Sequence, residues 1–194
     1  MYFKDLTIVL CVAFVLSACG GSSEPGDTGM AEDADDISVT EAELAGNPFM
    51  DQWETPYGVP PFADVRDEHY MPAFKKGILE LRAEIATVVE NPEAPTFDNT
   101  ILAMEKAGRL VDRVATTYFN IATTELNDEI QALQTEISPM LTREIDAINL
   151  NQDLFERVQA VYAQKDALEL DEQQARLLEL THRGFVRSGA ALPQ

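Results

Sequence analysis

The chain has 194 residues, of which 45% are hydrophobic, so it is long enough for one domain of ordinary size with a substantial core. Its 34 acidic and 14 basic side chains give a formal net charge of −20 at pH 7. Phosphate backbones and anionic lipid surfaces repel such a chain. The composition therefore argues against nucleic acid and against an anionic membrane surface as partners.

The first eighteen residues are predicted to be a lipoprotein signal peptide. Lys4 supplies positive charge near the N-terminus, and residues 6–16 form an apolar run too short to span a bilayer comfortably. Small residues then precede Cys19, and a Gly/Ser linker follows it. This pattern resembles a bacterial lipoprotein signal, in which the Cys sulfur carries the lipid.

The resemblance implies a lipid anchor at Cys19, on the periplasmic face of a bacterial cell envelope, through which the chain contacts the membrane. Gly20 is unlike an inner-membrane retention signal, which favours the outer membrane. The alternative is an ordinary cleaved signal peptide that places a Cys at the junction by chance.

Residues 19–46 contain eight acidic and no basic side chains, and almost no large apolar residue. Such a segment cannot bury enough surface to fold, so a flexible acidic tether is predicted. Cys11 lies within the signal segment, and Cys19 is then the one Cys of the mature chain. An internal disulfide and a zinc site built on thiolates are thereby excluded.

Residues 47–66 are predicted to form an extended arm, because prolines recur along them and prevent a helix. The aromatic residues of this arm alternate with the prolines: Phe49, Trp53, Tyr57 and Phe62. These rings could form a platform for a ligand. The favoured interpretation is that they are buried against the helices that follow.

From residue 67 onward, apolar residues recur at intervals of three and four, which is the pattern of amphipathic helices. Residues 97–124 carry the longest stripe and are predicted to form one unbroken helix, capped by Thr96. The other helices are predicted to begin at residues able to cap them: Asp67, Asn127, Asn151 and Asp171. Pro139 should bend the helix that begins at Asn127, and Gly189 is predicted to cap the C-terminal end of the last helix. The predicted fold class is all-α, a bundle of about five long helices behind an extended Pro/aromatic arm.

Few side chains in this sequence suit catalysis. Its two histidines, His69 and His182, lie on different predicted helices, and neither belongs to the H-E-x-x-H motif that binds zinc. His69 is interpreted as a hydrogen-bonding group at a helix end. His182, Arg183 and Arg187 form a cationic cluster that could bind a peptide carboxylate, although decoration of a helix C-terminus is the favoured interpretation. No catalytic and no metal-binding residue is predicted in this chain.

Four segments of the chain carry a family resemblance. They are NPFMDQWETPYGVPPFADVRDEHYMPAF (47–74), NPEAPTFDNTILAMEKAG (91–108), ISPMLTREIDAINLNQDLFERVQAVY (137–162) and LLELTHRGFVRSGAAL (177–192). In content and order they resemble the N-terminal helical region of the thimet oligopeptidase family of zinc metallopeptidases. The similarity is greatest to its peptidyl-dipeptidase and oligopeptidase A branch.

The resemblance implies an all-α fold with two lobes around a deep channel that admits short peptides. Residues 47–194 would supply one wall of that channel. In the family, H-E-x-x-H and a downstream Glu bind zinc in the later half, which has no counterpart here. We therefore expect a truncated chain that lacks its C-terminal lobe, binds no zinc itself and is inactive alone.

Two hypotheses about function follow. In the first, the complete protein is a zinc-dependent oligopeptidase, a dipeptidyl carboxypeptidase acting on short peptides, and this chain is its N-terminal part. In the alternative, the chain is a non-catalytic, lipid-anchored helical module that binds peptides or a partner protein.

Overall fold

The computed structural model describes residues 37–124 and 127–192, which belong to one compact unit, Asp36–Gln194. The predicted signal peptide, Cys19 and most of the predicted tether lie outside the described residues. Within the described ranges the regular structure is entirely helical, with no strand. No helix of the described part is long and apolar enough to cross a membrane. The predicted all-α class is confirmed.

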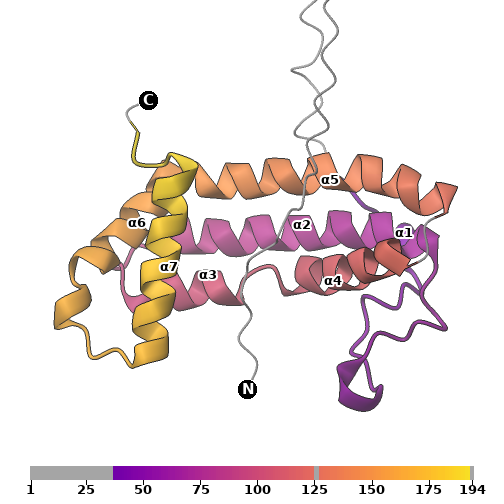
Figure 1. Ribbon diagram of the computed structural model, residues 1–194, viewed down its shortest axis with the longest axis horizontal. Helices are drawn as coiled ribbons and strands as arrows, with labels where there is room; N and C mark the ends of the chain where they lie inside the picture. The colour runs from indigo at the N-terminus through magenta and orange to yellow at the C-terminus, as the bar shows by residue number, and fades with distance from the viewer. Residues whose placement is uncertain (1–36, 125–126, 193–194) are drawn as a thin grey trace, which may run out of the picture. The chain divides into compact units, whose positions relative to one another are not determined.

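Five helices make up most of the unit: α2 (Asp67–Val89), α4 (Arg109–Thr124), α5 (Asp128–Asn149), α6 (Gln152–Ala163) and α7 (Glu172–Ser188). In Figure 1, α2, α4 and α5 lie side by side along the long direction of the unit, whereas α7 runs across the end of the unit away from α4, next to α6. α5 continues through Pro139 as a single helix. Short connections between long helices produce this bundle.

The helix ends show why these residues start helices where they do. Each predicted cap accepts a hydrogen bond from the backbone N–H three residues further on, at 2.8–3.1 Å: Thr96, Asn127, Asn151 and Asp171. Gly189 ends α7 in the left-handed conformation, with φ 96°. The predicted cap at Asp67 is wrong by one residue. α2 starts after Arg66, whose N–H donates to His69 Nδ1 at 3.1 Å, so His69 is a helix-end group as predicted.

The prediction of one unbroken helix over residues 97–124 is wrong. The stretch contains a π-helical turn η2 (Phe97–Leu102), a short helix α3 (Ala103–Lys106) and then α4, which begins after Gly108. Gly108 has φ 74°, a conformation that suits glycine, and its N–H donates to Glu84 Oε2 of α2 at 2.7 Å. The apolar stripe continues across this break, which is why periodicity alone did not reveal it.

Two clusters of buried side chains hold the unit together. One joins the first half of α2 to α4 and α5, and it centres on Tyr118, whose ring contacts Tyr70 and Phe74 and whose hydroxyl donates to the Ile130 carbonyl at 2.7 Å. The other joins the second half of α2 to η2, α6 and α7. Burial raises the pKa of Tyr118, so its phenol stays protonated and keeps that hydrogen bond.

The folded unit begins earlier than the predicted tether boundary at residue 46. Residues 41–44 form a helical turn, α1 (Glu41–Leu44), closed by reciprocal hydrogen bonds between Thr40 and Glu43. Ile37 packs against the first cluster. A capping box and one apolar anchor are therefore enough to order the end of an otherwise acidic segment.

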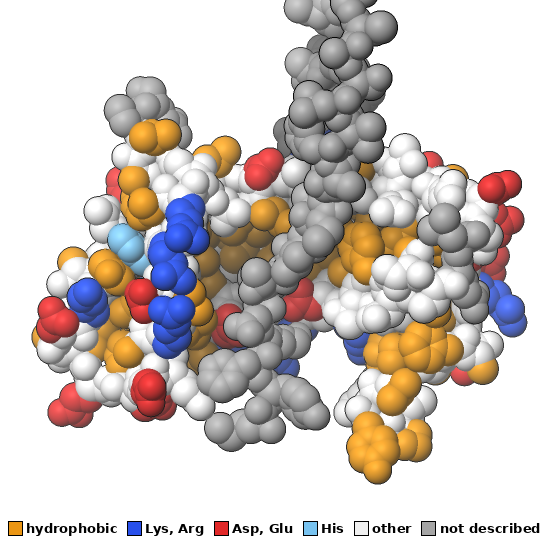
Figure 2. Space-filling model, viewed as in Figure 1, with side chains coloured by type: hydrophobic (Ala, Val, Ile, Leu, Met, Phe, Trp, Pro, Cys, Tyr) orange, Lys and Arg blue, Asp and Glu red, His pale blue; other side chains and the backbone are white. Residues whose placement is uncertain are grey.

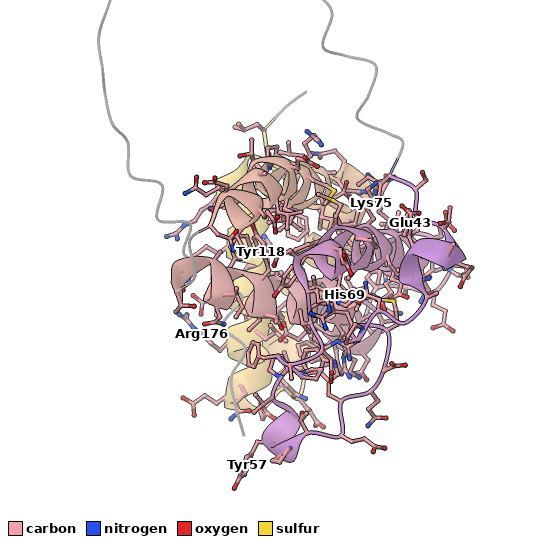
Figure 3. All side chains as sticks on the ribbon, turned by 90° about the vertical axis from the view of Figure 1, so that its right-hand side faces the viewer. Glu43, Tyr57, His69, Lys75, Tyr118 and Arg176 are labelled. Atoms are coloured by element: carbon pink, nitrogen blue, oxygen red, sulfur yellow. The ribbon has the colours of Figure 1, made fainter. Side chains whose placement is uncertain are left out.

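The arm is partly as predicted. Phe49 is fully buried, and Trp53 packs on Arg113, whose guanidinium lies 4.9 Å from the indole ring. Beyond Trp53, however, Tyr57 and Phe62 are exposed, and Figure 3 shows Tyr57 at the far tip of a protruding loop. The prediction that all four rings are buried is wrong for this outer half. Its short η1 turn (Pro56–Gly58) and prolines carry the chain away from the helices.

Candidate functional site

The cationic cluster predicted from the sequence lies on α7. Figure 2 shows basic side chains gathered along this helix, whose basic residues are all arginines. Arg183 Nη1 lies 3.5 Å from Glu179 Oε1, and the same carboxylate is bound by Arg176 Nη1 at 2.7 Å. The hydrogen bond from Arg176 is the main cause that lowers the pKa of Glu179. Arg187 is exposed in the last turn of α7, where a cation is favourable beside the helix C-terminus.

His182 has different neighbours from the two arginines. Its ring stacks on Tyr162 of α6, with a centroid distance of 3.9 Å and an interplanar angle of 3°, and it lies 6.1 Å from the Phe155 ring. Burial lowers the pKa of His182, and the charge of Lys165 lowers it further. The imidazole is therefore neutral at pH 7 and belongs to an aromatic stack. The contacts in the structure do not join it to Arg183 or Arg187 around one ligand position.

Lys165 completes this stack, a feature that the sequence analysis missed. Its Nζ donates to the Tyr162 hydroxyl at 3.3 Å and lies 4.6 Å from the centre of the Tyr162 ring. The hydrogen bond to Tyr162 raises the pKa of Lys165. A surface hollow of about 340 Å³ lies beside it, lined by Tyr162, Lys165, Asp166, Leu170, Ala175, Leu178 and Glu179. The spacing of three between Tyr162 and Lys165 was the available signal.

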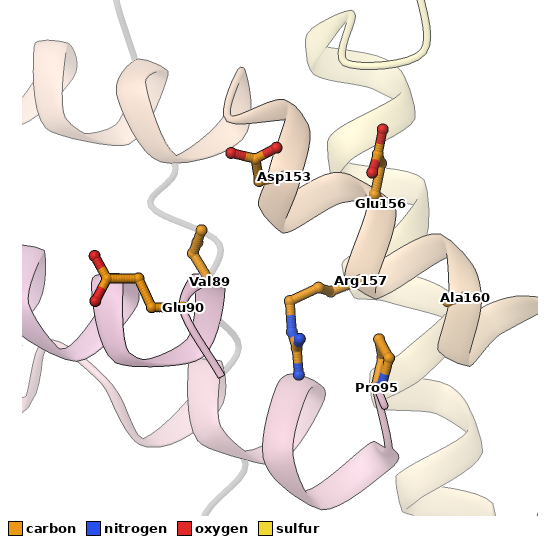
Figure 4. A pocket seen from close by; sticks show the side chains of 7 residues that line it. All are labelled: Val89, Glu90, Pro95, Asp153, Glu156, Arg157 and Ala160. Carbon is orange, nitrogen blue, oxygen red and sulfur yellow. The ribbon is translucent and has the colours of Figure 1, made fainter. Parts of the chain in front are cut away.

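A second surface hollow, of about 460 Å³, lies between α6 and the segment after α2 (Figure 4). Arg157 extends from α6 into this region and donates to the Asn91 carbonyl at 2.9 Å and to Asn99 Oδ1 at 3.4 Å. The other polar side chains around it are carboxylates: Glu90, Asp153 and Glu156. Through these hydrogen bonds, Arg157 links the connection between α2 and η2 to α6. No nucleophile with an adjacent base lines this hollow.

The described residues do not fit a zinc site. They contain no group of three or more His, Cys, Asp or Glu side chains placed to hold a metal ion. His69 Nδ1 already accepts the Arg66 N–H, and His182 is stacked on Tyr162. Cys19, the predicted lipidation site, lies outside the described residues.

No protein-family model matches the chain, whereas curated proteins do. It is 43% identical over 148 residues to a dipeptidyl carboxypeptidase of Escherichia coli (strain K12), and 40% identical over 151 residues to a dipeptidyl carboxypeptidase of Salmonella typhimurium. It is also 20% identical over 148 residues to oligopeptidase A of Salmonella typhimurium.

These matches cover 76–78% of this chain but only 21–22% of the relatives, within the N-terminal part of the dipeptidyl carboxypeptidases. The chain therefore spans about a fifth of the length of the curated relatives it matches. The resemblance to the thimet oligopeptidase family, in its peptidyl-dipeptidase and oligopeptidase A branch, is confirmed.

Proposed function

We propose that this chain is the N-terminal helical part of a zinc-dependent dipeptidyl carboxypeptidase, which removes dipeptides from the C-termini of short peptides. The observation that carries the proposal is the 43% identity over 148 residues to a protein of that name. Identity to the oligopeptidases A is about half as high, at 20–23%. That difference supports dipeptide release over cleavage at internal bonds.

The role of this chain within such an enzyme is structural and positional. Its two histidines have other partners, so the catalytic zinc would be held by residues outside the matched region. In the bundle of α2, α4 and α5, one cluster of buried side chains joins the three helices. We assign to this bundle one side of the channel that limits access to short peptides.

The experiment uses the native polypeptide, captured from its own cells with an antibody to residues 47–194. It is incubated with an N-terminally blocked hexapeptide that has a free C-terminus, and the products are identified by mass. We expect successive loss of dipeptides from the C-terminus and loss of activity in the presence of a zinc chelator. The same peptide with a C-terminal amide is the control, because a dipeptidyl carboxypeptidase needs the free carboxylate.

Two other results would contradict the proposal. Cleavage at internal bonds of both peptides would indicate an activity like that of oligopeptidase A. Peptide binding without any cleavage would favour the alternative, a non-catalytic, lipid-anchored binding module.

The location of the protein is a separate part of the proposal. The apolar run, the small residues before Cys19 and the Gly/Ser linker after it support a lipid-anchored protein on the periplasmic face of the outer membrane. Cys19→Ala should release the protein from the membrane fraction. If the variant still partitions into detergent, lipidation at Cys19 is wrong.

A further inference from the structure

The outer half of the arm exposes large apolar side chains. The relative exposures are 103% for Tyr57, 45% for Val59 and 48% for Phe62. Figure 2 shows hydrophobic side chains concentrated at the tip of this loop, and Figure 3 places Tyr57 at its end. The segment Thr55–Ala63 has no charged residue, in a chain whose net charge is −20. Such a surface is suited to contact with another apolar surface.

The loop has a defined shape because both its base and its tip are held by hydrogen bonds. At the base, Arg113 donates to the carbonyls of Phe49 and Asp51, and Trp53 Nε1 donates to the Pro48 carbonyl at 2.8 Å. At the tip, the Thr55 hydroxyl donates to the Val59 carbonyl, and the Gly58 N–H donates to the Thr55 carbonyl at 3.0 Å. The apolar side chains therefore lie on a protruding loop whose backbone is held by hydrogen bonds.

Tyr57 has an unfavourable backbone conformation at the tip of this loop. Its backbone has φ 62° and ψ 13°, a left-handed conformation that is unfavourable for a residue with a side chain. Such strain persists where surrounding contacts compensate for it, yet the Tyr57 ring is fully exposed. The hydrogen bonds of the turn hold this backbone, so the exposed ring is presented at the tip and is left available for a contact.

The small area of the exposed patch limits the kind of partner that it can bind. A stable complex of separate proteins buries about 1,200–2,000 Å² in total, far more than three side chains provide. The same patch is sufficient for a surface on the same polypeptide, because a covalent connection gives a high effective concentration. A second copy of this chain and an anionic bilayer are disfavoured, since both would repel a net charge of −20.

We propose that the loop Thr55–Ala63 docks against the remaining part of the same peptidase polypeptide, the part that corresponds to the other four-fifths of the curated relatives. The inference rests on the proposed function. Its contact surface would be an apolar recess that takes the rings of Tyr57 and Phe62, with an acceptor for the Tyr57 hydroxyl. The loop would thereby fix the helical wall to the rest of the enzyme.

The test compares the same variant in two proteins, the 194-residue chain and the native polypeptide from its own cells. The variant is Tyr57→Ser with Phe62→Ser. In the 194-residue chain, its thermal midpoint should stay unchanged because both rings are exposed there. In the native polypeptide, the midpoint should fall by several degrees, since two buried rings are lost. Tyr57→Phe is the matched control, because it keeps the ring and should keep most of the stability.

A second measurement follows Tyr57 directly, through its rate of chemical nitration or hydroxyl-radical labelling. The proposal predicts that Tyr57 reacts readily in the 194-residue chain and loses most of that reactivity in the native polypeptide. Equal reactivity in the two would overturn the docking, whether or not the native polypeptide cleaves peptides. Protection of Tyr57 in a polypeptide without dipeptide release would instead retain the docking and reject the proposed function.

Discussion

Arg82 of α2 and Glu144 of α5 form a two-point ion pair. Arg82 Nε donates to one carboxylate oxygen of Glu144 at 2.9 Å, and Arg82 Nη2 donates to the other. The Glu144 side chain is 8% exposed and that of Arg82 is 36% exposed. Because the geometry is bidentate, the pair fixes the register of α2 and α5 through two residues that lie 62 positions apart in the sequence.

Removal of one member of this pair is predicted to destabilise the bundle. Arg82→Ala leaves a buried carboxylate without its guanidinium partner, and we expect a loss of about 2 kcal/mol, reduced by the partial exposure of Arg82. Arg82→Met combined with Glu144→Met should recover most of this loss, since two apolar side chains need no pairing. Urea denaturation of the parent, Arg82→Met, Glu144→Met and the double variant completes a double-mutant cycle and measures the coupling. Additive effects would show that the two residues do not stabilise each other.

A second prediction concerns the contact between α2 and α4. A Cβ atom at Gly77 would lie 2.8 Å from the backbone nitrogen of Val111 and 2.9 Å from its Cα. Gly77→Ala should therefore push the two helices apart and destabilise the chain by about 1–3 kcal/mol. The matched control is Gly184→Ala on α7, where nothing lies within 4 Å and where alanine should stabilise by about 0.5–1 kcal/mol. If both variants have the same sign in thermal unfolding, the close approach at Gly77 is wrong.

Gly77 also illustrates how far the sequence could predict the fold. The 3.6-residue periodicity and the caps Asn127, Asn151 and Asp171 predicted the bundle and most helix starts, because both are local properties of the chain. The close approach at Gly77 could not be predicted, since a glycine within a helical pattern does not name its partner. The break at Gly108 was missed because its stabilising carboxylate, Glu84, lies on another helix.

The sequence predicted which charged residues the candidate site contains, but not the contacts that they make. The sequence placed His182, Arg183 and Arg187 close together, but their partners come from other positions. His182 stacks on Tyr162 of α6, and Arg183 shares Glu179 with Arg176. Helical periodicity gives the angular position of each residue around its helix, but it does not identify the side chains of other elements that the residue contacts.

The His182 stack predicts a dependence of stability on pH. Burial is the main cause that lowers the folded-state pKa of His182 below its ordinary value of 6.5. In the unfolded chain the imidazole takes up a proton as pH falls through 6.5, while in the folded chain it is still neutral. The contribution of neutral His182 to the free energy of unfolding should therefore be fully present above the pKa of the unfolded chain. It should be lost as the pH falls toward the pKa of the folded chain.

The variant His182→Phe isolates this effect, because it keeps a ring against Tyr162 and removes the titration. We expect the difference in unfolding midpoint between variant and parent to widen between about pH 7.5 and about pH 5.5. A constant difference across that range would mean that the folded chain does not hold His182 in its neutral form.

Arg187 gives a prediction for peptide binding. It is exposed at the C-terminal end of α7, so Arg187→Ala should cost only about 0.3–1 kcal/mol of stability through the helix dipole. The KM of the native polypeptide for a peptide with a free C-terminus should be nearly unchanged. A tenfold rise in KM, about 1.4 kcal/mol, with kcat maintained would instead support the hypothesis that this cluster binds the peptide carboxylate.

We propose that these helices are one part of a larger peptidase. The most direct measurement is the mass of the native polypeptide, captured from its own cells through residues 47–194. We expect a product several times heavier than the 21.5 kDa chain, since this chain covers only 22% of the length of the dipeptidyl carboxypeptidases that it matches. A product of about the mass of residues 19–194 plus acyl chains would contradict it and would favour a lipid-anchored binding module.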